Sequence, residues 1–326
     1  MTTAPRETTP IVAATRRMPG EPSIPGAELR VAGDTRIPPE RLPAFVEGAA
    51  IIVSMFSDRI DEAVLKAAGP SLKGVCNFAV GYDNIDLTTC AARNIVVTNT
   101  PDAVTEGTAN MAWTLLLAVA RRLLEGDRYA RTGLWAKGGP LGMADFLGMD
   151  LTGKTLHVVG AGRIGYAVAT RALAFGMRVM YTARSAHLNF ELAPLAAERV
   201  ELDAGLARAD VVSLHTPLTP DTRHMIDARR LALMKPTAIL INTARGPVVD
   251  EVALADALAN GRLYGAGLDV FEREPEVHPA LVPLENVVMA PHIGSAEIRF
   301  RALMTKMVCD NASAILAGRE PPNRVR

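Results

Sequence analysis

Short aliphatic runs alternate with longer segments of helical periodicity along most of the chain. In the first third, five such runs are predicted strands: 10–16, 27–33, 49–56, 73–80 and 94–100. Short runs of aliphatic residues bounded by turn residues are typical of buried strands. Because these strands are separated by helical segments, the pattern predicts an α/β fold with a parallel sheet covered by helices.

A second series of the same kind begins at Lys154. Its predicted strands are 154–160, 178–183, 199–202, 210–216, the second half of 231–244, 265–270 and 286–292. Predicted helices over 161–176 and 249–261 end at glycines, which favour the left-handed backbone that closes a helix. A last helix is predicted over 296–317. Two α/β series predict two similar lobes of unequal size.

The link between the two series contains the longest apolar run of the chain, 112–120, which is too short to span a bilayer. We predict one long helix over 102–126, buried along its middle. The glycine-rich residues 127–150 predict a connection with short turns only.

Composition narrows the functional classes. Lys plus Arg and Asp plus Glu both number 35, so the net charge is zero and neither a nucleic acid nor an anionic membrane is an expected partner. The odd number of cysteines, three, predicts buried thiols in a reducing compartment. The N-terminus lacks a basic region followed by an apolar one, so we expect no signal peptide, a cytoplasmic protein and a mobile Thr/Pro tail over residues 1–10.

A glycine motif follows the first strand of the second series. Gly160, Gly162 and Gly165 form G-x-G-x-x-G between a predicted strand and a predicted helix. The first glycine permits the tight turn, the second admits a pyrophosphate, and the third lets the helix pack against the strand. The helix N-terminus then offers N–H groups and partial positive charge to the phosphates. This context predicts a dinucleotide site.

The next strand ends at Thr182, where an acid would bind the adenosine ribose and repel a 2′-phosphate. No acid stands there. Arg184 offers a guanidinium fork suited to a phosphate dianion, and Ser185 adds a hydroxyl. We therefore predict preference for NADP(H), with NAD(H) as the alternative cofactor. The competing interpretation makes Arg184 an ordinary solvated arginine.

Three later strands are followed by Arg245, Glu274 and His292. An arginine can bind a carboxylate and polarise a carbonyl, and a histidine can give a proton to the alkoxide formed by hydride transfer. A carboxylate beside the histidine fixes its tautomer and favours the imidazolium. Taken singly, Arg245 could instead cap a helix or pair with Asp250, Glu274 could be a solvated charge, and His292 a loop residue.

Other chemistries find no support in the sequence. The six histidines form no i, i+4 pair and no Cys/His cluster, so no metal site is predicted. No G-x-S-x-G serine elbow is present. His215 follows a strand of the second series and is predicted to line the cofactor cleft.

These motifs together carry a family resemblance. The stretches "VVGAGRIG", "SLHTPLTPDT", "LINTARGPVVDE", "GLDVFEREP" and "PHIGSA" resemble, in order and spacing, the D-isomer-specific 2-hydroxyacid dehydrogenase family. "NFAVGYDNID" and "VTNTPDAVTEGTAN" resemble its substrate-lobe signatures. The resemblance runs from about Ile11 to the C-terminus, and "AVGYDNID", "FLGMDLTGKTL" and "GREPPN" are most similar to glyoxylate/hydroxypyruvate reductases.

The resemblance implies two Rossmann-like lobes, a flavodoxin-like substrate domain (1–103 and 295–326) and an inserted, doubly wound NAD(P)-binding domain (104–294). It implies Arg245, Glu274 and His292 as the catalytic set, with Arg245 and the backbone N–H groups of Val80 and Gly81 binding the substrate carboxylate. Asp269 is implied at the nicotinamide side, and a homodimer is expected through the 102–150 region. The full predicted cofactor set is Gly160, Ala161, Gly162, Arg163, Ile164, Ala183, Arg184, Ser185, His215, Thr216, Pro217, Thr243, Ala244, Asp269, Ile293 and Gly294.

The leading interpretation is an NADPH-preferring reductase of glyoxylate and hydroxypyruvate. A second keeps the chemistry with larger 2-oxo acids or 3-phosphoglycerate as substrates. A third, from another class, is a non-catalytic protein that senses a dinucleotide, similar to the C-terminal binding corepressors. One departure from the family lies in residues 18–27, where three prolines preclude the helix usual after the first strand.

Overall fold

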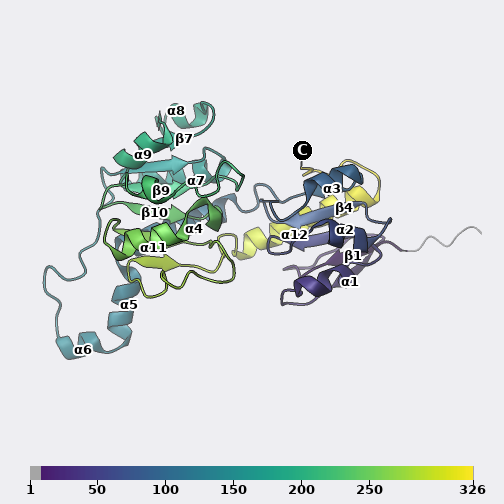
Figure 1. Ribbon diagram of the computed structural model, residues 1–326, viewed down its shortest axis with the longest axis horizontal. Helices are drawn as coiled ribbons and strands as arrows, with labels where there is room; N and C mark the ends of the chain where they lie inside the picture. Colours follow the sequence, from purple (N-terminus) through teal and green to yellow (C-terminus); the bar gives the residue numbers. More distant parts are fainter. Residues whose placement is uncertain (1–8, 326) are drawn as a thin grey trace, which may run out of the picture. The chain divides into compact units, whose positions relative to one another are not determined.

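The computed structural model describes residues 9–325, and the chain forms two compact units. Unit 1 contains the chain up to Val104 and from Ala296 onward, and unit 2 is the continuous segment between them, Thr105–Ser295. The tail predicted to be mobile lies, but for its last two residues, outside the described part of the chain. Figure 1 shows the elements of each unit.

Unit 1 is built on a parallel sheet that has, in its described residues, five strands in the order β2-β1-β3-β4-β5. The strands are β1 (Ile11–Ala14), β2 (Glu28–Val31), β3 (Ala49–Met55), β4 (Gly74–Phe78) and β5 (Val96–Thr98). This is the strand order of flavodoxin-like sheets. Every residue of β3 and β4 is buried, which explains their continuous apolar runs.

The helices of unit 1 are η1 (Pro39–Arg41), α1 (Leu42–Phe45), α2 (Glu62–Ala68), α3 (Leu87–Ala92) and α12 (Ile298–Leu316). Asp61 and Asp86 cap α2 and α3, each accepting a hydrogen bond from a first-turn amide. As the prolines predict, no helix joins β1 to β2 in the described chain. Instead the segment lies along α12, where the Thr305 hydroxyl donates to the Pro19 carbonyl (2.8 Å).

Unit 2 is built on a larger parallel sheet, which over the described residues has seven strands in the order β12-β11-β10-β9-β6-β7-β8. The strands are β6 (Thr155–Val159), β7 (Arg178–Thr182), β8 (Glu198–Arg199), β9 (Val211–Leu214), β10 (Ile239–Asn242), β11 (Gly265–Leu268) and β12 (Val287–Met289). The order reverses between β6 and β9, as in doubly wound dinucleotide-binding folds. The predicted α/β class with two Rossmann-like lobes is therefore confirmed.

Helices cover both faces of this sheet (Figure 1). They are α4 (Thr105–Ala120), α5 (Leu123–Arg131), α6 (Leu134–Gly138), α7 (Arg163–Ala172), η2 (Leu173–Phe175), α8 (Leu188–Glu191), α9 (Leu202–Arg208), α10 (Ala228–Leu231), η3 (Gly246–Val248) and α11 (Glu251–Ala259). One apolar core joins α4 and α7 to one face, and a second joins α9, α10 and α11 to the other. No described helix has the length and apolar character needed to cross a membrane.

The prediction of a single helix over 102–126 is wrong. Helix α4 ends at Ala120, Arg122 takes a left-handed backbone (φ +50°), and α5 then runs to Arg131, into the predicted connection. The cause is a distant segment. The Ala120 carbonyl accepts a hydrogen bond from the Met149 amide (2.8 Å), and a Cβ on Gly148 would lie 2.3 Å from the same oxygen. The returning chain therefore caps α4.

Two smaller results concern β8 and the cysteines. Strand β8 lies at Glu198–Arg199 instead of the predicted 199–202, because α9 begins at Leu202. Cys76, Cys90 and Cys309 are free and buried, as predicted.

Candidate active site

The glycine loop leaves the end of β6 and enters α7 at Arg163. Gly160 has φ +105°, and a Cβ there would lie 2.7 Å from the carbonyl carbon and oxygen of His215. A Cβ on Gly165 would lie 2.1 Å from the Gly160 carbonyl oxygen. Gly162 instead faces open space, with nothing within 4 Å of its Cβ position. The first and third glycines are thus required by packing, and the second leaves room for a ligand.

His215 lies beside this loop, after β9, at the point where the strand order reverses. Its amide donates to the Val159 carbonyl (2.8 Å), and its ring Nε2 lies 2.8 Å from the Ser213 hydroxyl. Burial of the ring lowers the pKa of His215 to about 3, so the imidazole is neutral at physiological pH. Thr216 and Pro217 follow it, half-buried and exposed respectively.

At the end of β7, the Thr182 side chain makes hydrogen bonds within the protein that the sequence does not predict. The Thr182 hydroxyl donates to the Val200 carbonyl (2.9 Å), so His157, whose Nε2 lies 2.8 Å away, must be the donor to Thr182. Both hydrogen bonds of this hydroxyl are therefore made within the protein. Beyond it Ala183 is half-buried, while the Arg184 and Ser185 side chains are exposed and have no hydrogen-bond partner among the described residues.

The His157 ring makes stability depend on pH. Burial, helped by nearby Arg208, lowers the pKa of His157 to about 4. Because the unfolded histidine titrates near pH 6.5, the unfolded chain binds the extra proton, and this group costs about 3 kcal/mol of unfolding free energy as the pH falls from 6.5 to 4. A His157→Gln variant keeps a hydrogen-bond donor for Thr182. Its free energy of unfolding, measured with urea, should fall by about 3 kcal/mol less than that of the wild type over this pH range. Equal declines in both proteins would contradict the assignment.

The turn after β10 places Arg245. Asn242 at the strand end accepts a hydrogen bond from the Ala244 amide (3.1 Å) and donates to the Arg245 carbonyl (3.0 Å). Sequence reasoning missed this residue, although asparagine at a strand end is a known turn signal. A Cβ on Gly246 would lie 1.9 Å from the Phe271 carbonyl carbon, so this turn runs directly against the segment leading to Glu274.

His292 and Glu274 form a hydrogen-bonded pair. His292 Nδ1 lies 2.7 Å from Glu274 Oε2, and the other Glu274 oxygen accepts from the Phe271 amide (3.1 Å). Since the carboxylate accepts, Nδ1 carries a proton. His292 has φ +54°, a costly backbone for a non-glycine residue.

Asp269 stabilises that backbone. Its two carboxylate oxygens accept hydrogen bonds from the amides of Ile293 and Gly294, each at 2.8 Å, and its carbonyl accepts from the His292 amide (2.8 Å). Burial raises the pKa of Asp269, while the two amides oppose that shift. The residue predicted to meet the nicotinamide thus holds the histidine turn; a cofactor contact stays a prediction.

The predicted site residues of unit 2 all follow strands at one edge of the sheet, because parallel strands share their carboxyl edge. Val80 and Gly81 belong to unit 1, after β4. The Asn99 and Asn77 side chains donate to their carbonyls (2.8 and 2.7 Å), and no described residue accepts from their amides. In the described chain, no group of three metal-binding side chains is found.

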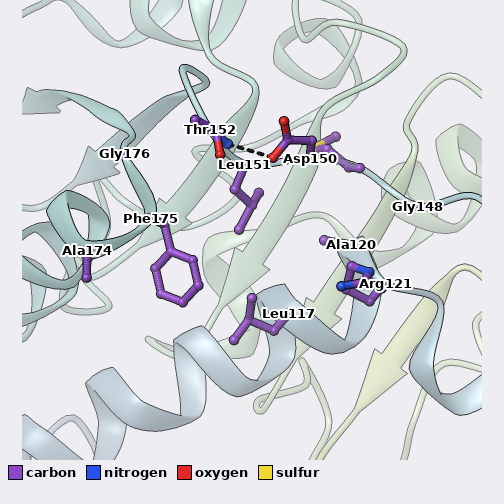
Figure 2. A pocket seen from close by; sticks show the side chains of 11 residues that line it. Leu117, Ala120, Arg121, Gly148, Asp150, Leu151, Thr152, Ala174, Phe175 and Gly176 are labelled. Atoms are coloured by element: carbon purple, nitrogen blue, oxygen red, sulfur yellow. Dashed lines mark hydrogen bonds between the residues drawn. The ribbon is translucent and has the colours of Figure 1, made fainter.

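One cavity of about 640 Å³ lies elsewhere in unit 2, and two of the segments that line it immediately precede β6 and β7 in the chain (Figure 2). Residues from α4, the 148–152 segment and 174–176 line it, among them Leu117, Leu151 and Phe175. None of the predicted site residues lines this cavity.

The fit to a dinucleotide rests on two observations. Gly162 leaves open space in the turn at the N-terminus of α7. The Thr243 hydroxyl, after β10 at the same sheet edge, is buried and has no hydrogen-bond partner among the described residues. Since an unpaired buried polar group costs free energy, it is a natural contact for a ligand.

Comparisons with known proteins agree with this fold and identify the family of the chain. Residues 113–294 match the family described as D-isomer specific 2-hydroxyacid dehydrogenase, NAD binding domain. A glyoxylate reductase of Thermococcus onnurineus is 51% identical over 278 residues, 84% of this chain and 82% of the relative. A crystal structure of a Thermus thermophilus protein has a TM-score of 0.89 at 46% identity and covers 97% of this chain and 100% of its own.

A further solved structure contains a cofactor. The NADPH-dependent glyoxylate/hydroxypyruvate reductase of Sinorhizobium meliloti, in complex with NADP and malonate, has a TM-score of 0.84 at 34% identity, covering 98% of this chain and 97% of its own. Fold, site and matches define an NAD(P)-dependent oxidoreductase whose cofactor is a nicotinamide dinucleotide. The chain belongs to the D-isomer-specific 2-hydroxyacid dehydrogenase family.

Proposed function

We propose that the chain is an NADPH-preferring reductase that converts glyoxylate to glycolate and hydroxypyruvate to D-glycerate. The observation that carries the chemistry is the 2.7 Å bond between His292 and Glu274, on the sheet edge that also bears the glycine loop. The substrate class is supported by the relatives named glyoxylate reductase and glyoxylate/hydroxypyruvate reductase.

In this proposal unit 2 binds the dinucleotide. The Gly160–Gly165 loop with Arg163 and Ile164 would hold the pyrophosphate. The bound dinucleotide would also be a hydrogen-bond partner for the buried Thr243 hydroxyl. When bound, the nicotinamide supplies the hydride that reaches C2 of the substrate. Further proposed contacts with the dinucleotide come from Thr216, Pro217, Ala244, Ile293 and Gly294.

His292 supplies the proton. In its imidazolium form, His292 would donate Nδ1–H to Glu274 and would give the Nε2 proton to the oxygen at C2. As C2 gains the hydride, the carbonyl π pair moves to oxygen, which takes the Nε2 proton and becomes the product hydroxyl. His292 returns to the neutral form with its proton on Nδ1, and solvent restores the other.

Arg245 provides positive charge for the substrate. Its guanidinium would pair with the 2-oxo acid carboxylate and stabilise the negative charge that develops on the carbonyl oxygen. In unit 1 the amides of Val80 and Gly81, which donate to no described residue, are proposed as further carboxylate donors.

A panel of kcat/KM values for glyoxylate, hydroxypyruvate and pyruvate, each with NADPH and NADH, tests the proposal. We expect the first two substrates with NADPH to rank highest. Preference for a larger 2-oxo acid or 3-phosphoglycerate would keep the chemistry and refute the substrate assignment. No cofactor oxidation with any of them would favour the dinucleotide-sensing alternative.

Arg184 is expected to select the cofactor. Replacing it with alanine removes a charge-assisted contact to the 2′-phosphate, so kcat/KM with NADPH should fall about 10- to 100-fold, while the value with NADH stays within about twofold. Arg178→Ala, an exposed arginine at the other end of β7, is the matched control. If Arg184→Ala affects both cofactors alike, or neither, Arg184 is an ordinary surface residue.

We also propose a cytoplasmic homodimer formed through the α5–α6 region. Figure 1 shows α5 and α6 reaching away from the sheet of unit 2. Between residues 123 and 147 this region exposes Leu123, Leu124, Leu134, Trp135, Leu141, Met143 and Leu147. So many exposed apolar side chains indicate a protein contact.

Sedimentation equilibrium should give a mass near twice the 34.7 kDa of the chain. Leu134→Glu should shift the protein toward the monomer, because it places a charge in the contact. Val252→Glu, at an exposed position of α11, should not. A monomeric wild type would refute the dimer.

A further inference from the structure

The turn that follows β7 carries the two side chains proposed to recognise a 2′-phosphate, Arg184 and Ser185. Both are exposed, and neither is held by a hydrogen bond to the described chain. An unsupported pair on a surface turn would lose much of its binding energy to ordering. Selective recognition therefore requires that something else fix the backbone of this turn.

The ends of the turn are fixed by the glycine loop and by the Tyr181 side chain of β7. At its start, the Thr182 carbonyl accepts a hydrogen bond from the Gly160 amide (2.9 Å), which joins it to the glycine loop. At its far side, the His187 amide donates to the Tyr181 hydroxyl (2.9 Å), and that hydroxyl donates to Glu191 (2.6 Å).

The middle of the turn is held by one side chain, Arg199 of β8. Its Nε and Nη2 donate to the Ala183 carbonyl at 3.3 and 3.1 Å, and Nη2 also donates to the Arg184 carbonyl at 3.1 Å. A planar guanidinium can hold two adjacent carbonyls at once, which a lysine ammonium on a flexible stem does poorly. Arg199 thus fixes the peptide units from which the Arg184 and Ser185 side chains project.

Charge at this turn also favours an anion. Two carboxylates near the turn in sequence are engaged elsewhere, Glu198 with Arg208 (2.5 and 2.8 Å) and Glu191 with Tyr181 (2.6 Å). A third, Glu201, is exposed and forms no ion pair with Arg199. Arg184 and Arg199 have no acidic partner among the described residues. A 2′-phosphate, with a charge of about −1.5 to −2, suits such a surface.

We propose that Arg199 is a positioning residue that sets the preference for a 2′-phosphorylated dinucleotide by holding the Ala183 and Arg184 carbonyls. This rests on the proposed NADPH preference and adds a residue that touches neither the nicotinamide nor the substrate. The side chain is exposed and its hydrogen bonds go to this turn alone, so its removal should leave the core of unit 2 intact.

Calorimetric titration with two matched probes tests the proposal. Adenosine 2′,5′-bisphosphate and 5′-AMP differ only in the 2′-phosphate. For the full chain carrying Arg199→Gln, we expect Kd for the bisphosphate to rise about tenfold, the effect of losing roughly one well-placed hydrogen bond, and Kd for 5′-AMP to change less than about twofold. Arg199→Lys keeps the charge without the fork and should behave like Arg199→Gln.

Arg178→Gln is the control, because Arg178 donates in the same way to a backbone carbonyl, that of Gly153 (3.2 Å), at the opposite end of β7. It should bind both probes as the wild type does. Equal weakening of both probes by Arg199→Gln, or no weakening, overturns the proposal. Recovery in Arg199→Lys overturns positioning in favour of charge alone.

The experiment also separates this inference from the one on which it rests. If the wild type binds the two probes with equal affinity, the proposed NADPH preference fails and Arg199 has nothing to select. If the wild type prefers the bisphosphate and Arg199→Gln keeps that preference, only the role of Arg199 is refuted.

Discussion

Replacing His292 with asparagine is expected to lower kcat for glyoxylate reduction about 10³-fold, within the usual range for removal of a general acid. Asparagine is small enough for the turn and tolerates the left-handed backbone at this position (φ +54°) better than most residues. The hydrogen bonds that the neighbouring amides donate to Asp269 should therefore keep the turn in place. Stopped-flow and steady-state rates with saturating NADPH measure the loss.

The control for this variant is His278→Asn. His278 Nδ1 accepts only a local hydrogen bond, from the Ala280 amide (3.3 Å), so its replacement should leave kcat within about twofold, as for most surface changes. Cofactor affinity should be nearly unchanged in His292→Asn, because the loss is of proton transfer. A fall of less than about tenfold in kcat would show that another group protonates the substrate oxygen.

Replacing Arg245 with glutamine is expected to reduce kcat/KM about 10²- to 10³-fold, the usual effect of removing a group that stabilises charge in the transition state. Arg245→Lys should recover only part of this, because an ammonium cannot bind the carboxylate with a fork. Arg262→Gln, an exposed arginine paired with Asp256 (2.9 Å), is the control. A loss below about tenfold for Arg245→Gln would refute the polarising role.

Sequence patterns predicted those structural features whose physical cause lies in neighbouring residues. The buried strands β3, β4, β6 and β9 follow from continuous aliphatic runs, and the glycine loop follows from the steric needs of Gly160 and Gly165. The missing helix after β1 follows from three prolines. In each case the physical cause lies within a few residues of its effect.

Features with distant causes were not predictable in this way. Helix α4 ends because Met149 and Gly148 return to Ala120, which no helical periodicity reveals. The Thr182 hydroxyl is committed to His157 and Val200, from different elements. The support given by Asp269 to the His292 turn appears only when the ends of β11 and β12 lie side by side.

The site residues divide along the same line. Arg245, Glu274 and His292 were selected by side-chain chemistry and by their places after strands, and the structure brings Glu274 and His292 into contact. Arg199, which holds two backbone carbonyls in position, has no chemistry that marks it in the sequence, and Asn242 has only the turn signal of an asparagine at a strand end. Residues that act through hydrogen bonds to carbonyls and amides are found only from the fold.

Transfer of a hydride from NADPH to C2 of a small 2-oxo acid can be measured directly with a labelled cofactor. Glyoxylate is incubated with the protein and NADPH that carries deuterium at both C4 positions, and the glycolate formed is examined by mass spectrometry and NMR. We expect glycolate with one deuterium, at C2, formed in step with NADPH oxidation and formed about 10³-fold more slowly by His292→Asn. Unlabelled glycolate, or no oxidation of NADPH, would contradict this expectation.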